Sequence, residues 1–318
     1  MSISIIPIKE SEKFFSEILL VCISFETKRW KAYLSKYKDK YQKIILFYNK
    51  EFVHLYKDHI EDYKGDNLYE LIETSINDPL DTADKYVEVV KKYKDKLVDI
   101  DCSTFTHEHI LILIKIFIHF EYNKNINIIY TGVDEYSVGQ TGGWLSKGTK
   151  DIRNVLGYSG SLLPSKQLHL IIMVGLENER IEKIIEEYEP NKITIGKCTE
   201  NSSLDNKFSI LNQKHHQRVD DFIKNILSNI NDSQEFEFSC DNPEDTYEVL
   251  NAIINKNIQY NNIIIAGNSK ISTLGVVKVT EANENVQLCY AQPLEYNIES
   301  YTSGIKDFRY FRIKFNEK

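Results

Sequence analysis

The sequence has no excess of positive charge. It contains 39 Lys and Arg residues against 47 Asp and Glu residues, which gives a formal net charge of −8. Proteins that coat DNA or RNA neutralise many phosphate groups with basic side chains, so this balance argues against general nucleic-acid coating. An acidic chain still has room for a local basic pocket.

The sequence also lacks a membrane-spanning run and a secretion signal. No apolar run reaches the roughly 18 residues that a membrane span needs. The longest run, residues 110–120, contains Lys115 and His119 and is predicted to be a buried helix. The N-terminus has no basic segment followed by an apolar core and a cleavage site, so no signal peptide is expected. We therefore predict a cytoplasmic protein with no membrane partner.

Patterns for metals, cofactors and known catalytic sites are missing. The five cysteines occur singly and are interpreted as small buried thiols in a reducing compartment. His107 and His109 are two residues apart and His215 and His216 are adjacent, so neither pair shares a helix face as metal ligands would. No Walker loop, GxGxxG turn or Ser-His-Asp order occurs. We expect no metal and no cofactor.

Short apolar runs alternate with helical stretches along the whole chain. This alternation predicts the α/β class, with two Rossmann-like, mostly parallel sheets. Residues 51–93 are predicted to be helical with a break near Pro79, and a Gly-rich loop precedes a short helix at 150–156. A long helix is predicted at 209–230. The predicted strands cover residues 19–25, 43–48, 97–102, 126–131, 168–174, 192–196, 235–239, 263–266, 286–290 and 308–315.

Sequence landmarks recur in the same order in the two halves, which indicates an internal duplication. We predict domains at 1–160 and 161–318, joined by the turn-rich connector 157–166. Two copies related by an approximate two-fold axis are expected to share one cleft. The matching landmarks are Glu26 and Arg29 with Glu177 and Arg180, Glu135-Tyr136 with Glu295-Tyr296, and Lys150-Asp151-x-Arg153 with Lys306-Asp307-x-Arg309.

A polar turn follows one strand of each half and opens a helix. Such a turn aims backbone N–H groups and hydroxyls at an anion, and the helix dipole assists. Ordinary capping of the helix by Ser and Thr is the alternative interpretation. The residues concerned are Ser103, Thr104 and Thr106 in the first half, and Asn268, Ser269 and Lys270 in the second.

Two glutamate–arginine pairs follow strands at the edge of the sheet where ligands bind. Glu26 and Glu177 are predicted to orient Arg29 and Arg180 toward a phosphate or carboxylate. Each pair is otherwise a helix-surface ion pair, worth only a few tenths of a kcal/mol. Lys306 and Arg309 are further candidate ligand contacts that add positive charge, or they lie on a solvated face. Tyr136 and Tyr296 are candidates for stacking on a base, or they simply pack in the protein.

The segment IIIAGNSKISTLGVVKV, followed by NVQLCYAQP, resembles the CRISPR-associated Rossmann-fold (CARF) ligand-sensing domains. In those domains a turn of the Gly-Thr-Lys type links a strand to a helix, and Asn268-Ser269-Lys270 would fill it here. The first-half segment DIDCSTFTHEHI is similar but has Phe105 in place of the lysine. The resemblance implies a cleft that binds a nucleotide signal, often a cyclic oligonucleotide, and relays it to an effector.

We therefore predict a sensor or regulatory subunit that binds an anionic, nucleotide-derived ligand between its halves. The resemblance implies antiviral defence as the setting, and a separate effector chain, because both halves are used for sheets. One alternative is a nucleotide-cleaving enzyme, a phosphodiesterase or glycosidase, with Glu26 or Glu177 as the acid/base group. The other is a structural adaptor subunit of a larger complex.

Overall fold

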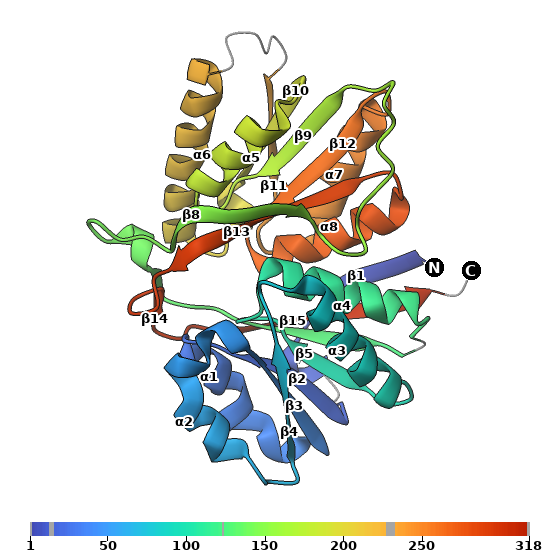
Figure 1. Ribbon diagram of the computed structural model, residues 1–318, viewed down its shortest axis with the longest axis vertical. Helices are drawn as coiled ribbons and strands as arrows, with labels where there is room; N and C mark the ends of the chain where they lie inside the picture. Colours follow the sequence, from blue (N-terminus) through green and yellow to red (C-terminus); the bar gives the residue numbers. More distant parts are fainter. Residues whose placement is uncertain (1, 13–15, 123, 227–232, 317–318) are drawn as a thin grey trace. The chain divides into compact units, whose positions relative to one another are not determined.

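The computed structural model of the chain describes residues 2–12, 16–122, 124–226 and 233–316. It divides into two compact units, which differ from the predicted halves. Unit 1 comprises Met1–Glu135 and Ile298–Lys318, and unit 2 comprises Tyr136–Asn297. Each unit has one large sheet with helices on both faces (Figure 1).

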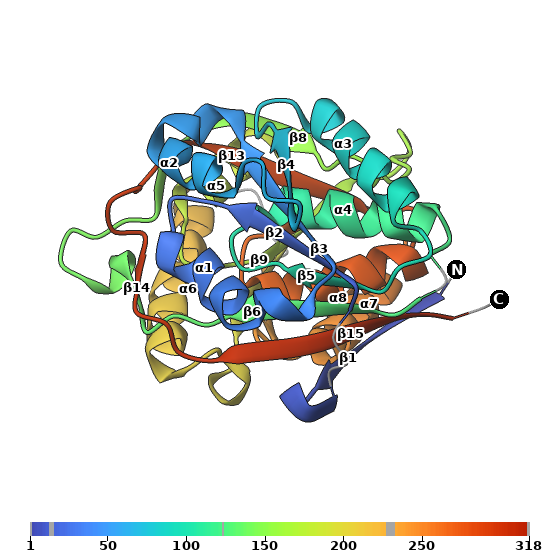
Figure 2. The ribbon, with the colours of Figure 1, turned by 90° about the horizontal axis from the view of Figure 1, so that it is seen from below.

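The sheet of unit 1 has the strand order β1-β15-β6-β5-β2-β3-β4. Strands β2 to β6 pair in parallel, whereas β15 is antiparallel to both β6 and β1. Figure 2 shows β1 alongside β15 at this edge. The strands are β1 (Ser2–Ile8), β2 (Ile18–Ile23), β3 (Lys43–Asn49), β4 (Tyr69–Thr74), β5 (Val98–Asp101), β6 (Ile126–Thr131) and β15 (Phe308–Asn316).

Four helices cover the sheet of unit 1. They are α1 (Thr27–Tyr37), α2 (Val53–Tyr63), α3 (Pro79–Lys92) and α4 (His107–His119). Trp30 and Tyr33 of α1 and Tyr56 of α2 pack on buried side chains of β2 and β3. Strand β2 reads ILLVCI and is buried at every position, as expected of a parallel strand that is covered on both faces.

The sheet of unit 2 has the order β11-β10-β9-β12-β13-β8, and only the β8 pairing is antiparallel. Its strands are β8 (Ser146–Asn154), β9 (Leu168–Met173), β10 (Lys192–Cys198), β11 (Ser233–Phe238), β12 (Asn261–Ala266) and β13 (Gln287–Tyr296). Its helices are α5 (Glu179–Tyr188), α6 (Asn206–Ile226), α7 (Pro243–Lys256) and α8 (Lys270–Ala282). A separate two-stranded ladder joins β7 (Glu135–Tyr136) to β14 (Thr302–Ser303). The short 3-10 helices are Glu10–Glu12, Lys38–Lys40, Lys50–Phe52, Ser137–Gly139 and Glu200–Ser202.

The two sheets repeat one plan, which confirms the predicted class of two duplicated, mostly parallel Rossmann-like sheets. Five parallel strands follow the same winding in both, with β2, β3, β4, β5 and β6 matching β9, β10, β11, β12 and β13. The sixth, antiparallel strand is exchanged between the sequence halves. Strand β8 comes before the second set of five strands and pairs with β13, whereas β15 ends the chain and pairs with β6.

This exchange moves the unit boundaries away from the predicted division at residues 160 and 161. Residues 146–154 fall in the predicted first domain but form β8 of the second sheet, where a loop and short helix were predicted. The predicted helical stretch 51–93 is also wrong in part, because it contains β4. Both β4 and β8 are edge strands with many half-exposed or exposed positions, so neither has a continuous apolar run. Residues 227–230 of the predicted long helix lie outside the described residues.

The expectation that all five cysteines are thiols is wrong for two of them. Cys198 and Cys240 form a disulfide with a Cα–Cα distance of 5.9 Å. Cys22, Cys102 and Cys289 are buried thiols, and burial raises the pKa of Cys289 to about 12. In the part of the chain that the structure describes, no helix is long and apolar enough to cross a membrane.

Candidate functional site

Each sheet has one point where its winding reverses. In unit 1 the chain runs outward from β2 to β3 and β4, then returns to the other side of β2 to form β5 and β6. In unit 2 the same reversal separates β9 from β12. Open α/β sheets bind ligands at this place, outside the carboxyl ends of the strands. We call residues 24–29 with 102–106 the first switch point, and residues 174–180 with 267–270 the second.

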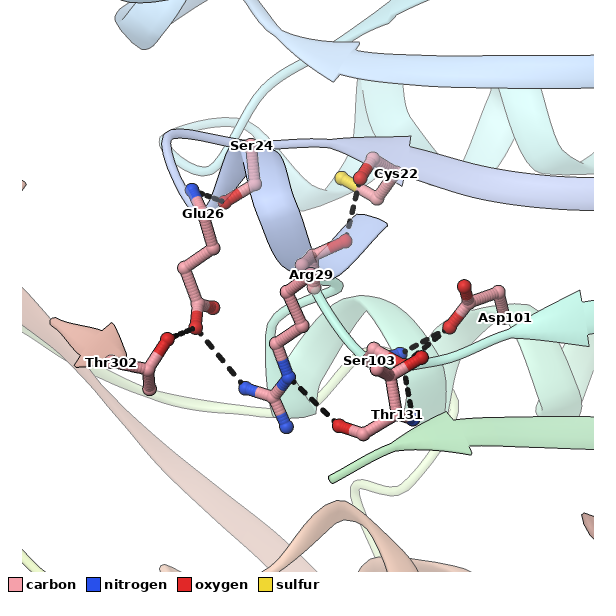
Figure 3. A network of polar contacts seen from close by, with 9 residues as sticks. Cys22, Ser24, Glu26, Arg29, Asp101, Ser103, Thr131 and Thr302 are labelled. Atoms are coloured by element: carbon pink, nitrogen blue, oxygen red, sulfur yellow. Dashed lines mark hydrogen bonds and ion pairs between the residues drawn. The ribbon is translucent and has the colours of Figure 1, made fainter. Parts of the chain in front are cut away.

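A buried arginine organises the first switch point (Figure 3). The Arg29 side chain is only 3% exposed; its Nη1 lies 3.2 Å from Glu26 Oε1 and its Nε donates to the Thr131 carbonyl at 3.0 Å. The Thr302 hydroxyl donates to the same Glu26 oxygen at 2.6 Å, and the Ser24 hydroxyl accepts from the Glu26 N–H at 3.2 Å. Arg29 therefore ties the start of α1 to the end of β6.

The hydroxyls of the first polar turn bond within the protein. Ser103 donates to the Asp101 carboxylate, and its oxygen accepts from the Thr131 N–H at 2.7 Å. The Thr104 hydroxyl donates to the Cys22 carbonyl at 2.6 Å. These bonds hold the ends of β2, β5 and β6 together, so the turn is fixed in place beside Arg29 (Figure 3).

Two further predicted hydroxyls cap helices. Thr106 is the N-cap of α4 and accepts from the His109 N–H at 3.1 Å. Ser269 is the N-cap of α8; it accepts from the Ser272 N–H at 3.0 Å and donates to the Cys240 carbonyl at 2.6 Å. Both helices have 13 residues, so their N-terminal dipoles face the two switch points at comparable strength.

The second switch point repeats the arginine network. Arg180 pairs with Glu177 through Nη2, and its Nη1 donates to the Ala291 carbonyl at 2.7 Å. The Ser146 hydroxyl donates to the other Glu177 oxygen. Ser146 begins the exchanged strand β8, whereas Thr302, which reaches Glu26, lies in β14 ahead of β15. The Arg180 side chain is 19% exposed, so this copy lies nearer to solvent than Arg29.

The turns after β9 and β12 touch at the second switch point. A Cβ atom on Gly175 would lie 1.9 Å from the Gly267 carbonyl oxygen. The Asn268 side-chain amide donates to the Val174 carbonyl, which joins the same two turns. Lys270 is the first residue of α8 and is half-buried. The second switch point therefore combines a tightly closed main chain with one lysine at a helix N-terminus.

The contact between these turns yields a stability prediction. Replacing Gly175 with alanine is expected to lower the free energy of unfolding by about 1–3 kcal/mol, because two main-chain segments must separate to admit the methyl group. Urea unfolding followed by circular dichroism measures the change. Gly139→Ala is the control, since its Cβ would meet only Leu211 at 3.6 Å. Equal effects in the two variants would contradict the close approach.

The remaining landmarks lie on the exchanged strands and near their ends. Asp151 and Arg153 on β8 form an ion pair at 2.6 Å, and Asp307 and Arg309 at β15 form one at 3.3 Å. Asp151 and Arg153 are two apart in β8 and share one strand face, whereas Asp307 directly precedes β15. The lysines of both motifs, Lys150 and Lys306, are exposed.

The two candidate stacking tyrosines differ in their surroundings. The Tyr136 ring lies 5.9 Å from the Phe208 ring, whereas Tyr296 ends β13 opposite Ser146. Both are half-buried. The structure thus brings the predicted Glu, Arg and hydroxyl residues to the switch points, and it places the tyrosines and the Lys-Asp-x-Arg motifs in packing or strand contacts.

The carboxylates proposed as acid/base groups are engaged by donors. Glu26 and Glu177 each accept from an arginine and a hydroxyl. Contacts of this kind orient a guanidinium. Among the described residues, no three His, Cys, Asp or Glu side chains gather as metal ligands.

A pocket of about 650 Å³ lies at the carboxyl ends of β10 and β11 in unit 2. None of the predicted site residues lines it. His216 does, although the adjacent pair His215-His216 gave no sequence signal beyond its poor spacing for a metal. Sequence reasoning missed this pocket because its residues come from two strands, a helix and the segment after β10, with no common motif.

His215, on the same helix, gives a pH prediction. Burial and the positive charge of Arg218 lower the pKa of His215 to about 4, whereas Glu177 acts in the opposite direction. The unfolded chain, with a pKa near 6.5, therefore binds a proton first. The free energy of unfolding is expected to fall by at most about 3 kcal/mol as the pH drops from about 6.5 to about 4.

Urea titrations at a series of pH values measure this dependence. In His215→Gln the slope between pH 6.5 and pH 4 is expected to be smaller, because the group that charges on unfolding is gone. A variant with the slope of the parent protein would contradict the assignment to His215.

Comparisons with known proteins give little further information. No family model matches the chain, and no curated protein matches it. Among solved structures, a universal stress protein from Archaeoglobus fulgidus matches with a TM-score of 0.28 and 10% identity, over 87% of this chain and 96% of that chain. At these values the likeness carries no argument about a ligand or activity, and the fold assignment rests on the strand order of the two sheets.

Proposed function

We propose that this protein is a sensor or regulatory subunit that binds an anionic, nucleotide-derived ligand at its switch points and acts on a separate effector chain. One observation supports this most. Polar residues predicted from separate parts of the sequence converge at the place in each sheet where ligands of open α/β folds bind.

The chemistry of the switch points suits an anion. Each is faced by the N-terminus of a 13-residue helix, which attracts negative charge. Arg29 lies at the first switch point, and Arg180 and Lys270 lie at the second. Glu26 and Glu177 balance the charges of the two arginines, and Lys270 adds a positive charge at the second switch point.

The resemblance of residues 263–279 and 285–293 to CARF domains supports a nucleotide signal, with a cyclic oligonucleotide and antiviral defence as its specific form. The cleft shared by the two halves and the cytoplasmic location stay predictions. The Cys198–Cys240 disulfide is of a type uncommon in the cytosol, so its redox state in cells tests the location. No specific observation favours the nucleotide-cleaving or adaptor hypothesis.

Calorimetric titration with mono-, di- and cyclic oligonucleotides tests the proposal. At least one is expected to bind, and Lys270→Ala is expected to weaken its binding by about tenfold, because a hydrogen bond to a charged group is lost. Lys57→Ala, on the exposed surface of α2, removes the same charge elsewhere and should leave binding unchanged. A folded protein that binds none of these nucleotides would overturn the proposal.

A further inference from the structure

The pocket at the ends of β10 and β11 has a polar lining. The strands supply Lys197 and Glu237, and helix α6 supplies His216. Thr199 directly follows β10, and Glu200 begins the short 3-10 helix that comes next. Pockets of 300–1,000 Å³ are the usual size for small-molecule sites, and this one measures about 650 Å³. It lies at the carboxyl edge of the sheet but does not include the second switch point.

His216 supplies an acceptor without a partner. The residue is 5% exposed, and its Nε2 has no hydrogen-bond partner. With its hydrogen on Nδ1, the neutral ring presents Nε2 as an acceptor. Burial lowers the pKa of His216, which keeps the ring neutral at pH 7.

The Thr199 hydroxyl is a second polar group without a hydrogen-bond partner. Its oxygen is shielded from water. A buried polar atom without a partner costs about 1–3 kcal/mol, so both Thr199 and His216 gain if a ligand supplies the missing bond. Both atoms are closed to water, and a ligand therefore reaches them through a local side-chain rotation, such as a change of χ1 at Thr199.

The charges in the pocket favour a cation. Lys197 is neutralised by Glu235, whose carboxylate lies 3.3 Å from its Nζ. Glu200 and Glu237 are exposed, and neither has an ion-pair partner in the part of the chain that the structure describes. With a neutral imidazole beside them, two carboxylates remain to attract positive charge.

The matching place in unit 1 is built differently. Strands β3 and β4 end at Asn49 and Thr74, which bond to each other at 3.0 Å. The Tyr56 hydroxyl donates to the Asn49 carbonyl at 2.5 Å, and the Ser75 hydroxyl donates to Glu51 at 2.5 Å. The polar groups at the ends of β3 and β4 thus form hydrogen bonds with one another, whereas Thr199 and His216 at the corresponding place in unit 2 each have an atom without a partner.

We propose that this pocket binds a small organic amine, whose N–H groups donate to His216 Nε2 and the Thr199 hydroxyl and whose charge is met by Glu200 and Glu237. This site and its ligand are separate from the anionic ligand of the switch points. An acceptor-rich, net negative pocket rejects phosphates and carboxylates and accepts ammonium groups.

A matched series of four-carbon probes tests the proposal by calorimetry. 1,4-Diaminobutane is expected to bind, whereas 1,4-butanediol and succinate, which replace the amines by hydroxyls or carboxylates, are not. Glu200→Gln combined with Glu237→Gln is expected to weaken diamine binding by about fivefold, and Glu248→Gln on α7 should have no effect. The ¹⁵N resonance of His216 Nε2 should shift on addition of the diamine.

The variant Thr199→Val separates a loss of diamine binding from a loss of stability. The lost hydroxyl has no partner in the protein, so stability is expected to change little while diamine binding weakens severalfold. Absence of diamine binding, preference for the diol or succinate, or binding that is unchanged in Thr199→Val and in the double glutamine variant would each overturn the proposal.

Discussion

Replacing Arg29 with methionine is expected to lower the free energy of unfolding by about 3–5 kcal/mol. The change leaves the Glu26 carboxylate, 8% exposed, without its counter-ion, and it removes the donor to the Thr131 carbonyl. Breaking one side of a buried ion pair costs this much because the remaining charge stays in a poorly solvated place. Urea unfolding at pH 7 measures the loss.

Two companion variants show whether burial is the cause. Arg180→Met breaks the corresponding pair in unit 2, where the arginine side chain is 19% exposed, and a smaller loss of about 1–2 kcal/mol is expected. Adding Glu26→Gln to Arg29→Met should restore part of the lost stability, since the uncompensated charge is removed. If Arg29→Met lowered the free energy of unfolding by no more than the loss of an exposed ion pair does, this would contradict the burial of the Arg29–Glu26 pair.

Replacing Asp99 with alanine is expected to lower the free energy of unfolding by a similar amount, about 3–5 kcal/mol. Asp99 is fully buried on β5 and accepts from the Ser16 hydroxyl at 2.5 Å, the Tyr41 hydroxyl at 2.6 Å and the Asn127 amide at 2.8 Å. The variant leaves three buried donors without this acceptor, and each such group costs about 1–3 kcal/mol. Urea unfolding again gives the magnitude.

Asp99→Asn and Asp84→Ala are the controls for this prediction. The asparagine keeps one acceptor oxygen and should cost less than the alanine. Asp84 is exposed on α3, so its replacement should change the free energy of unfolding by no more than about 0.5 kcal/mol. Equal losses in Asp99→Ala and Asp84→Ala would show that the buried network does not contribute.

The sequence carries a clear signal for the inner strands and a weak one for the edges. Strand β2 is an unbroken apolar run, because parallel central strands are covered on both faces. Strand β8, with the sequence SKGTKDIRN, has almost no apolar side chains and lies at the edge of its sheet, where solvent reaches one side. Periodicity therefore could not distinguish β8 from a loop.

Strand exchange could not be predicted from the repeat. The Lys-Asp-x-Arg match placed 150–153 and 306–309 at equivalent points, but a repeated motif does not say which sheet receives each strand. Pairing depends on register and on the partner edge, and both were unknown. The structure resolves this by pairing β8 with β13 and β15 with β6.

The candidate site was predictable in position but not in its contacts. Residues after parallel strands gather at one edge, which is why Glu26, Arg29 and Ser103 were expected near each other. The carbonyl of Thr131 as the partner of Arg29 has no sequence signal, because any residue supplies a carbonyl. The same holds for His216, whose role depends on a missing partner and not on its neighbours in sequence.

Hydrogen exchange measured with and without the tightest-binding nucleotide of the panel tests the central claim most directly. Ligand binding at the switch points predicts slower exchange in peptides that cover residues 24–29 and 102–106, and in those that cover 174–180 and 267–270. Protection confined to other segments, such as 197–201 and 213–217, or no protection by a nucleotide that binds, would contradict ligand binding at the switch points.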